Sequence, residues 1–318
     1  MLKGKLYKAV YNNQNLNEAW NKVKKNKGAG GVDNIDIIRF NKMAFSNLLS
    51  LKEQLRKKTF QPKPIRRFNI KKTDGKIRPI GILTVEDRIA QRAVLQVIEP
   101  LFDRQFTPAS FGYRKGLSTQ HAIEQVIRNF NRNFQWVVDA DILDFFQCVE
   151  HNILMEQVKK LIKDRNTLQL VRKWLNLGVT GSGPERMKGR KQGKRGILQG
   201  SPLSPLLANI YLDSFDKAIL KKGLKLVRFG DDFIIQCRTR KEAESALKYA
   251  QKKLKKLKLE IHPHKTQIAH FDKGVRFLGN ILKSYFGTDG KSLQIILIKK
   301  AILKEKENHV RTLHQKTW

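Results

Sequence analysis

The chain has 318 residues, of which 40% are hydrophobic and 29% charged, a balance typical of a globular protein with room for two or three subdomains. Lysine and arginine number 64 against 28 aspartates and glutamates, so the formal net charge is +36. A surplus of this size destabilises a compact fold by self-repulsion unless a polyanion screens it, and nucleic acid is the obvious polyanion.

Two classes of protein are excluded by what the sequence lacks. It has no run of about 18 apolar residues and no apolar segment near its start, which argues against a membrane protein. The two cysteines, Cys148 and Cys237, form no CxxC pair, which argues against zinc ribbons and fingers. So few cysteines indicate a reducing compartment, and we expect a cytoplasmic protein.

The first half of the chain alternates helical spacing with strand-like runs. Glycines break the pattern at 27–35, and Pro62 and Pro64 end the second helix. The segment 65–82 has two apolar runs about the turn residues TDG, which predicts a hairpin. Apolar residues recur every three or four positions in the predicted helices, which are 14–26, 45–60, 86–103, 119–130 and 153–176.

In the second half, an apolar run at 136–146 leads into acidic residues, and 224–237 reads as two strands about a tight turn. The basic, glycine-rich segment 178–196 is either a hairpin that grips RNA backbone or a solvated loop. The other predicted elements are a helix at 201–222 entered through proline, a helix at 241–259, a strand pair or bend at 275–282 and a helical basic tail at 293–318. The irregular alternation predicts an α+β fold with an antiparallel sheet.

Three carboxylates stand at the ends of apolar strands. Asp231 and Asp232 interrupt the stretch VRFGDDFIIQ, and Asp141 ends the apolar run of another strand. An Asp-Asp turn by itself is more often a plain turn. A third acid at a strand end is unexpected in so basic a chain, but carboxylate oxygens are the ligands that hard divalent cations prefer. Two such ions roughly 3.5–4 Å apart can activate a 3′ hydroxyl and stabilise leaving pyrophosphate.

Several blocks of the sequence resemble, in order, those of bacterial reverse transcriptases of the group II intron type. The stretches VVDADILDFFQCVEHNIL, RGILQGSPLSPLLANIYLDSFD and VRFGDDFIIQC resemble the palm motifs of that family. KLEIHPHKTQI and VRFLGNIL match the blocks that follow. NIKKTDGKIRPIGI and FGYRKGLSTQHAI match fingers blocks, and NKGAGGVDNI matches the N-terminal extension. The resemblance runs from about residue 15 to 285.

This resemblance implies a right-hand polymerase with fingers and palm, in which helices back an antiparallel palm sheet. Only about 35 residues follow FLGNIL, so we expect a short or truncated thumb and neither the maturase extension nor the HNH endonuclease of the family. The implied domains are an N-terminal extension (1–60), fingers (61–135), first palm part (136–152), fingers and palm helices with the basic loop (153–196), second palm part (197–282) and start of the thumb (283–318).

The resemblance also assigns the metal site. Asp141, Asp231 and Asp232 would bind two Mg²⁺ ions, with Mn²⁺ as an alternative, and the backbone carbonyl of Ile142 would add a ligand. Gly230 stands where the family usually has alanine. We expect it to loosen the strand, at a cost of roughly 0.5–1 kcal/mol.

Five residues would bind the incoming nucleotide. Phe146 stands where the family has the aromatic ring that excludes a ribose 2′ hydroxyl, although it could also be ordinary core beside Phe145. Gln199 and Gly200 would contact the nucleotide itself. Lys72 and Arg78 would reach its triphosphate; Lys71 or Lys76 could substitute, and any one of these lysines could be a solvated surface charge.

Lys265 matches the family lysine proposed to protonate the leaving pyrophosphate. The neighbouring His262 and His264 invite a metal reading, but loop histidines are the simpler interpretation because no third ligand stands near them in the sequence.

The function implied is an RNA-directed DNA polymerase, a nucleotidyltransferase that copies RNA into cDNA for a group II intron or a related mobile or defence element. Its partners would be an RNA template with a DNA or RNA primer, dNTPs and its own intron RNA, with no membrane. Two alternatives stay open: an RNA-binding maturase that folds its intron RNA, and an inactive truncated fragment. The intact acids favour the polymerase, since a pure RNA binder has no use for three converging carboxylates.

Overall fold

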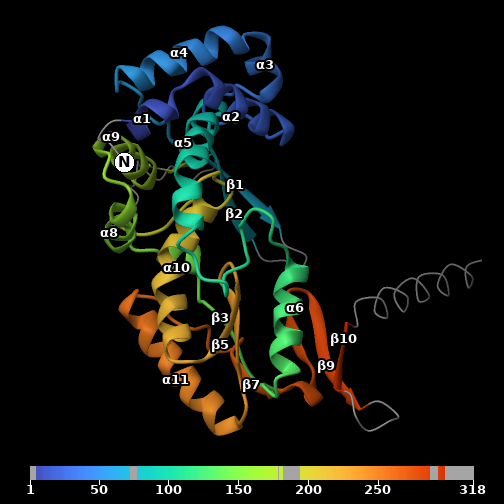
Figure 1. Cartoon of the computed structure of the whole chain (residues 1–318). Helices are drawn as coiled ribbons and strands as arrows, with labels where there is room; N and C mark the ends of the chain where they lie inside the picture. Colours follow the sequence, from blue (N-terminus) through green and yellow to red (C-terminus); the bar gives the residue numbers. More distant parts are fainter. Residues whose placement is uncertain (1–4, 72–76, 178, 182–193, 287–292, 298–318) are drawn as a thin grey trace, which may run out of the picture. The chain divides into compact units, whose positions relative to one another are not determined.

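The computed structural model describes residues 5–71, 77–177, 179–181, 194–286 and 293–297 (Figure 1). It divides into two compact units, which are described separately below. Unit 1 comprises Met1–Phe106 and Asp144–Asp213, and unit 2 comprises Thr107–Leu143 and Ser214–Trp318. Helices mixed with antiparallel strand pairs in both units confirm the predicted α+β class.

Unit 1 is mostly helical and is organised around one buried helix, α5 (Val85–Asp103). Its apolar positions recur with helical spacing and are buried, and α1 and α2 pack against it. Thr84 caps its first turn by accepting the backbone N–H of Asp87. The other helices of unit 1 are α1 (Lys5–Val10), α2 (Asn13–Lys25), α3 (Ile37–Lys42), α4 (Ala44–Arg56), α7 (Phe145–Cys148), α8 (His151–Leu161), α9 (Arg165–Leu175) and most of α10 (Ser204–Lys221).

Three strands form the sheet of unit 1, in the order β2-β1-β4. The predicted hairpin is confirmed: β1 (Ile65–Lys71) pairs antiparallel with β2 (Ile77–Ile82). From the basic segment, β4 (Val179–Gly181) pairs parallel with β1, while 178 and 182–193 lie outside the described residues.

The predicted single helix 153–176 is wrong, because the chain forms α8 and α9 with a break between them. Ile162 has an extended backbone at the end of α8. The Asp164 side chain then accepts the backbone N–H of Thr167 at 2.9 Å and starts α9. Aspartate favours a helix start over a helix interior, which explains the break.

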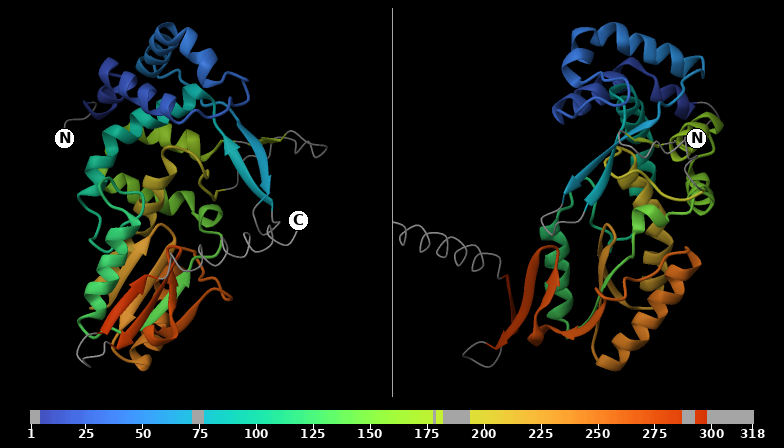
Figure 2. Two further views of the ribbon diagram at one scale, coloured as in Figure 1. Left: turned by 90° about the vertical axis from the view of Figure 1, so that its right-hand side faces the viewer. Right: turned by 180° about the vertical axis from the view of Figure 1, so that it is seen from behind.

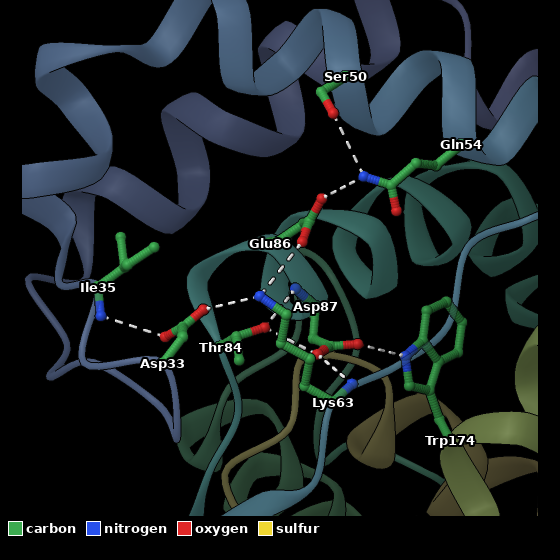
Figure 3. A network of polar contacts seen from close by, with 9 residues as sticks. All are labelled: Asp33, Ile35, Ser50, Gln54, Lys63, Thr84, Glu86, Asp87 and Trp174. Carbon is green, nitrogen blue, oxygen red and sulfur yellow. Dashed lines mark hydrogen bonds and ion pairs between the residues drawn. The ribbon is translucent and has the colours of Figure 1, made fainter.

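A buried carboxylate joins three segments of unit 1, namely the start of α5, the segment at Lys63 and α9 (Figure 3). Asp87 is 1% exposed and accepts three hydrogen bonds: from the Thr84 hydroxyl at 2.7 Å, the Lys63 backbone N–H at 3.0 Å and the Trp174 indole N–H at 3.1 Å. The network continues through the Lys63 ammonium to Asp33 at 3.3 Å. Burial raises the pKa of Asp87, and the three donors oppose that rise.

The main sheet of unit 2 is antiparallel throughout, in the order β5-β6-β3-β7. Helices α6 and α11 cover its two faces (Figures 1 and 2). A second sheet has the order β10-β9-β8. The elements of unit 2 are α6 (Thr119–Phe130), β3 (Trp136–Asp141), β5 (Lys225–Phe229), β6 (Asp232–Cys237), α11 (Arg240–Lys256), β7 (Gln267–His270), the 3-10 turn η1 (Phe271–Lys273), β8 (Val275–Phe277), β9 (Asn280–Phe286), β10 (Leu293–Leu297) and the end of α10.

Alternation along the strands separates the core of unit 2 from its acids. Val137, Val227 and Ile234 lie in one buried cluster with the apolar face of α6. Phe277 and Leu282 of the second sheet join the same cluster. Since side chains two residues apart share a face, the acids further along β3 and β6 lie on this face too, where the apolar cluster ends.

The expected helical tail is wrong at its beginning, because 293–297 form β10, which pairs antiparallel with β9. Residues 298–318 lie outside the described part of the chain. The strand pair expected at 275–282 is confirmed as β8 and β9. The six-part domain division stays a prediction.

No helix among the described residues is both long and apolar enough to cross a membrane.

Asp87→Ala should lower the free energy of unfolding by about 2–3 kcal/mol, because it leaves three buried donors without their acceptor. Urea denaturation followed by tryptophan fluorescence would measure this. Glu53→Gln is the control, since Glu53 forms a surface pair with Arg56 and should change stability by less than about 1 kcal/mol. Equal small effects from both substitutions would show that the Asp87 network does not hold unit 1 together.

Candidate active site

Two carboxylates face each other across the centre of the unit 2 sheet. In the register of β3 and β6, Asp141 lies directly opposite Asp232. Such opposite pairs have Cβ atoms about 4.5–5.5 Å apart on one face of the sheet. Asp232 is also opposite Phe229 of β5, so the turn between β5 and β6 consists of Gly230 and Asp231 alone.

The backbone conformation of the turn explains why a glycine stands at position 230. Gly230 has a φ of +71°, a conformation that other residues adopt only at a cost. A positive φ at the first of two turn residues belongs to the primed turns, which match the twist of paired strands. The expectation that Gly230 loosens a strand is therefore wrong, because Gly230 lies in the turn and permits it.

A fourth acid, Asp139, was missed by the sequence analysis. It lies two residues before Asp141 on the same face and accepts a hydrogen bond from the Gln267 side chain at 3.0 Å. Burial raises the pKa of Asp139, and the nearby Asp141 raises it further. The period-two spacing of the two aspartates in WVVDAD was the signal that could have found it.

Charge in this cluster is poorly compensated. Burial, followed by the repulsion of Asp139, Asp141 and Asp231, raises the pKa of Asp232 to about 7. Burial also raises the pKa of Asp231, with a smaller contribution from Asp141. Because the carboxylates repel one another when all of them are ionised, a cation bound between them would favour their charged forms.

A lysine of the chain forms an ion pair with the cluster. The Lys265 ammonium lies 2.8 Å from an Asp141 carboxylate oxygen, and its side chain is 61% exposed. The backbone brings it there, because the His262 N–H donates to the Asp141 carbonyl at 2.8 Å. The structure thus places Lys265 beside the acids, and its role as a proton donor to the leaving group stays a prediction.

Ile142 follows Asp141 and forms an isolated bridge with Ile261. Its side chain is buried at 2% exposure, in agreement with a core residue. Successive carbonyls of a strand point to opposite sides, and the Asp141 carbonyl points to His262. The Ile142 carbonyl is therefore directed to the side on which β6 lies.

The donor chemistry of this cluster fits a hard divalent cation, since its oxygen ligands are carboxylates with raised pKa values. Among the described residues, however, no group of three or more His, Cys, Asp or Glu side chains is close enough to hold a metal ion. The acids thus form an anionic cluster rather than a closed metal cage.

Residues 70–282 match the family described as "Reverse transcriptase (RNA-dependent DNA polymerase)". The chain belongs to this family. Reverse transcriptases depend on divalent metal ions, so the carboxylate cluster has the chemistry that the family requires.

Relatives support the group II resemblance. Protein YkfC of Escherichia coli K12 is 29% identical over 79% of this chain and 75% of its own length. The group II intron-encoded protein LtrA of Lactococcus lactis subsp. cremoris is 30% identical over 71% of this chain. The chain spans 48% of LtrA, about half of that relative. A solved telomerase from Candida albicans has a TM-score of 0.54 at 14% identity, covering 82% of this chain and 50% of its own, which shows a shared fold.

The predicted nucleotide-binding residues of this reverse transcriptase belong to unit 1. The Phe146 carbonyl accepts the Ile197 N–H at 2.7 Å, and its ring lies edge-on to Phe145. Gln199 is half-buried, and Gly200 is exposed with a φ of +90°. Their approach to the acids stays a prediction.

The two residues predicted to bind the triphosphate lie wholly or partly outside the described residues. Lys72 lies outside the described residues. Arg78 lies on β2 opposite Ile70, and its side chain is outside the described part of the chain.

The pKa of Asp232 predicts a pH effect on the metal-free protein. Protonation of a group with a raised pKa stabilises the fold, so this contribution is present near pH 4 and is lost as the pH rises through about 7. In EDTA, the Tm of Asp232→Asn minus that of the wild type should therefore grow between pH 4 and 8. Differential scanning fluorimetry would measure it.

Asp144→Asn, a change at an exposed carboxylate, serves as the control and should show no such trend. A Tm difference for Asp232→Asn that is independent of pH would contradict the raised pKa.

Proposed function

We propose that the chain is an RNA-directed DNA polymerase that makes cDNA by nucleotidyl transfer, with Asp141, Asp231 and Asp232 as ligands of two Mg²⁺ ions. The observation that carries the proposal is the register of β3 and β6, which sets Asp141 opposite Asp232 and places Asp231 in the adjoining turn. The raised pKa of Asp232 supports it, because the cluster gains stability from added positive charge.

When bound, the metal ions would activate the primer 3′ hydroxyl and neutralise charge at phosphorus and on the leaving pyrophosphate; Mn²⁺ can substitute for Mg²⁺. The three carboxylates hold these cations, and the Ile142 carbonyl adds an oxygen on the side of β6. The ammonium group of Lys265 lies beside Asp141. In this proposal it donates a proton to the leaving pyrophosphate.

The nucleotide-binding roles complete the proposal. Lys72 and Arg78 bind the triphosphate of the dNTP, as cations on a fingers hairpin can. Gln199 and Gly200 contact the nucleotide, and Gly200 allows close approach of the backbone. Phe146 is the ring that crowds a ribose 2′ hydroxyl, and its backbone is held by Ile197.

The partners we propose are an RNA template with a DNA or RNA primer, and intron RNA of the chain's own element. A net charge of +36 supports a polyanionic partner, and the similarity to LtrA supports a group II intron or a related element. The scarcity of cysteine supports a reducing compartment, and we place the activity in the cytoplasm.

A second candidate is an RNA-binding maturase. The chain is 28% identical, over 27% of its length, to nuclear intron maturase 1 of Arabidopsis thaliana. That match covers 12% of the maturase, so it supports the polymerase core more than the splicing role.

Primer extension on an RNA template with dNTPs and Mg²⁺ tests the proposal. Asp231→Ala and Asp232→Ala should each lower the extension rate by about 10²-fold or more, because several kcal/mol of transition-state stabilisation is lost. Glu244→Gln, which removes a surface pair with Arg240 in the same unit, should leave the rate unchanged. Wild-type protein that binds RNA in a filter assay but extends no primer would favour the maturase.

Phe146→Ala should raise incorporation of ribonucleotides relative to deoxynucleotides by about tenfold or more, since a missing ring no longer rejects the 2′ hydroxyl. Single-nucleotide extension with dNTP and rNTP pairs would give the ratio of kcat/KM values. If that ratio stays at the wild-type value while the protein remains folded, Phe146 is a core residue beside Phe145 and not a specificity residue.

A further inference from the structure

Unit 2 contains a fully buried arginine that contacts the Gly230–Asp231 turn. Arg228 is 0% exposed, although it lies in the apolar strand β5. Its side chain pairs with Asp216 of α10, through Nε at 2.7 Å and Nη2 at 2.5 Å. Such a bidentate pair fixes the plane of the guanidinium.

The guanidinium also contacts the turn and a serine hydroxyl. Its Nη1 donates to the Gly230 carbonyl at 2.8 Å, and its Nη2 also donates to the Ser110 hydroxyl at 2.8 Å. The Gly230 carbonyl belongs to the peptide that joins the two turn residues. Arg228 therefore holds the backbone of the turn that carries Asp231.

A second segment, residues 109–112, packs against the same turn. The Arg228 N–H donates to the Ala109 carbonyl and the Phe111 N–H to the Arg228 carbonyl, both at 2.8 Å. Gly112 then passes so close to the turn that a Cβ atom on it would lie 2.4 Å from the Gly230 nitrogen. Only glycine permits this approach of two backbones.

Stability alone is a weak reason for such an arrangement. A buried ion pair loses most of its Coulomb energy to desolvation, and apolar residues of similar volume often stabilise a fold equally well. The pair does, however, fix the direction of the remaining guanidinium donors, one of which reaches the turn.

We propose that Arg228 is a positioning residue for the acids of the active site, held by Asp216 and Ser110 and assisted by Gly112. This set, which we call the turn clamp, fixes the Gly230–Asp231 turn before a cation arrives, so that the carboxylates need little rearrangement to bind it. The proposal rests on the proposed role of Asp231 and Asp232 as metal ligands.

The test uses the full chain with both charges removed, Asp216→Leu together with Arg228→Met. Arg228→Met alone would leave Asp216 buried and unpaired, which could unfold the protein. The double variant should keep a Tm close to that of the wild type. Backbone amides of 229–232 should exchange hydrogen faster, Mn²⁺ measured by EPR should bind about three- to tenfold more weakly, and extension should slow by about 10²-fold.

The matched control lies at the other end of β6. Asn129 donates to the Gln236 side chain at 3.0 Å, and both residues are buried. Asn129→Leu with Gln236→Leu removes a buried polar pair from the same unit without touching the turn. It should change the Tm but leave Mn²⁺ affinity and exchange at 229–232 unchanged.

Gly112→Ala probes the clamp without altering its charges. The added methyl group must displace the turn, so this variant should also weaken Mn²⁺ binding and speed exchange at 229–232.

Wild-type exchange and Mn²⁺ affinity in the Asp216→Leu/Arg228→Met variant would overturn the clamp, even if its Tm falls. Hydrogen exchange and Mn²⁺ affinity test the turn clamp even if the chain extends no primer. A wild-type protein without extension activity would overturn the proposed function instead.

Discussion

The two-residue turn between β5 and β6 is the constraint on which the candidate active site of unit 2 depends. Because Gly230 accepts a positive φ, the strands can reverse direction within two residues, and Phe229 then pairs with Asp232. That pairing sets the register of β6 against β3, and the register sets Asp232 opposite Asp141. A shift of β6 by one residue would send Asp232 to the other face of the sheet, away from Asp141.

The buried Asp87 and the half-buried Asp232 are carboxylates in contrasting surroundings. Asp87 in unit 1 accepts three hydrogen bonds from neutral donors of the chain, so its charge is satisfied within the fold. Asp232 in unit 2 is surrounded chiefly by other acids, and its pKa rises to about 7. The first carboxylate is held by hydrogen bonds within the fold, while the second lies among like charges whose repulsion a bound cation would reduce.

The overall positive charge of the chain makes this cluster of acids unusual. A surplus of +36 favours association with a polyanion, yet four aspartates lie together where the central strands β3 and β6 of one sheet meet the turn. Lys265, 2.8 Å from Asp141, is the one positively charged side chain that the described residues show in an ion pair with an acid of this cluster.

The sequence by itself determined the family, the α+β class and the three acids, because these depend on residue identity, on block order and on local periodicity. It located α2, α5 and α6 within one residue and α11 within three, since each has a clear apolar face. The tertiary structure decided the rest: Asp139 joins the cluster, Gly230 forms the turn, Arg228 holds that turn from behind and β10 replaces the expected start of a helix. These features depend on which segments pair across long stretches of chain, and local sequence patterns carry no record of the partner.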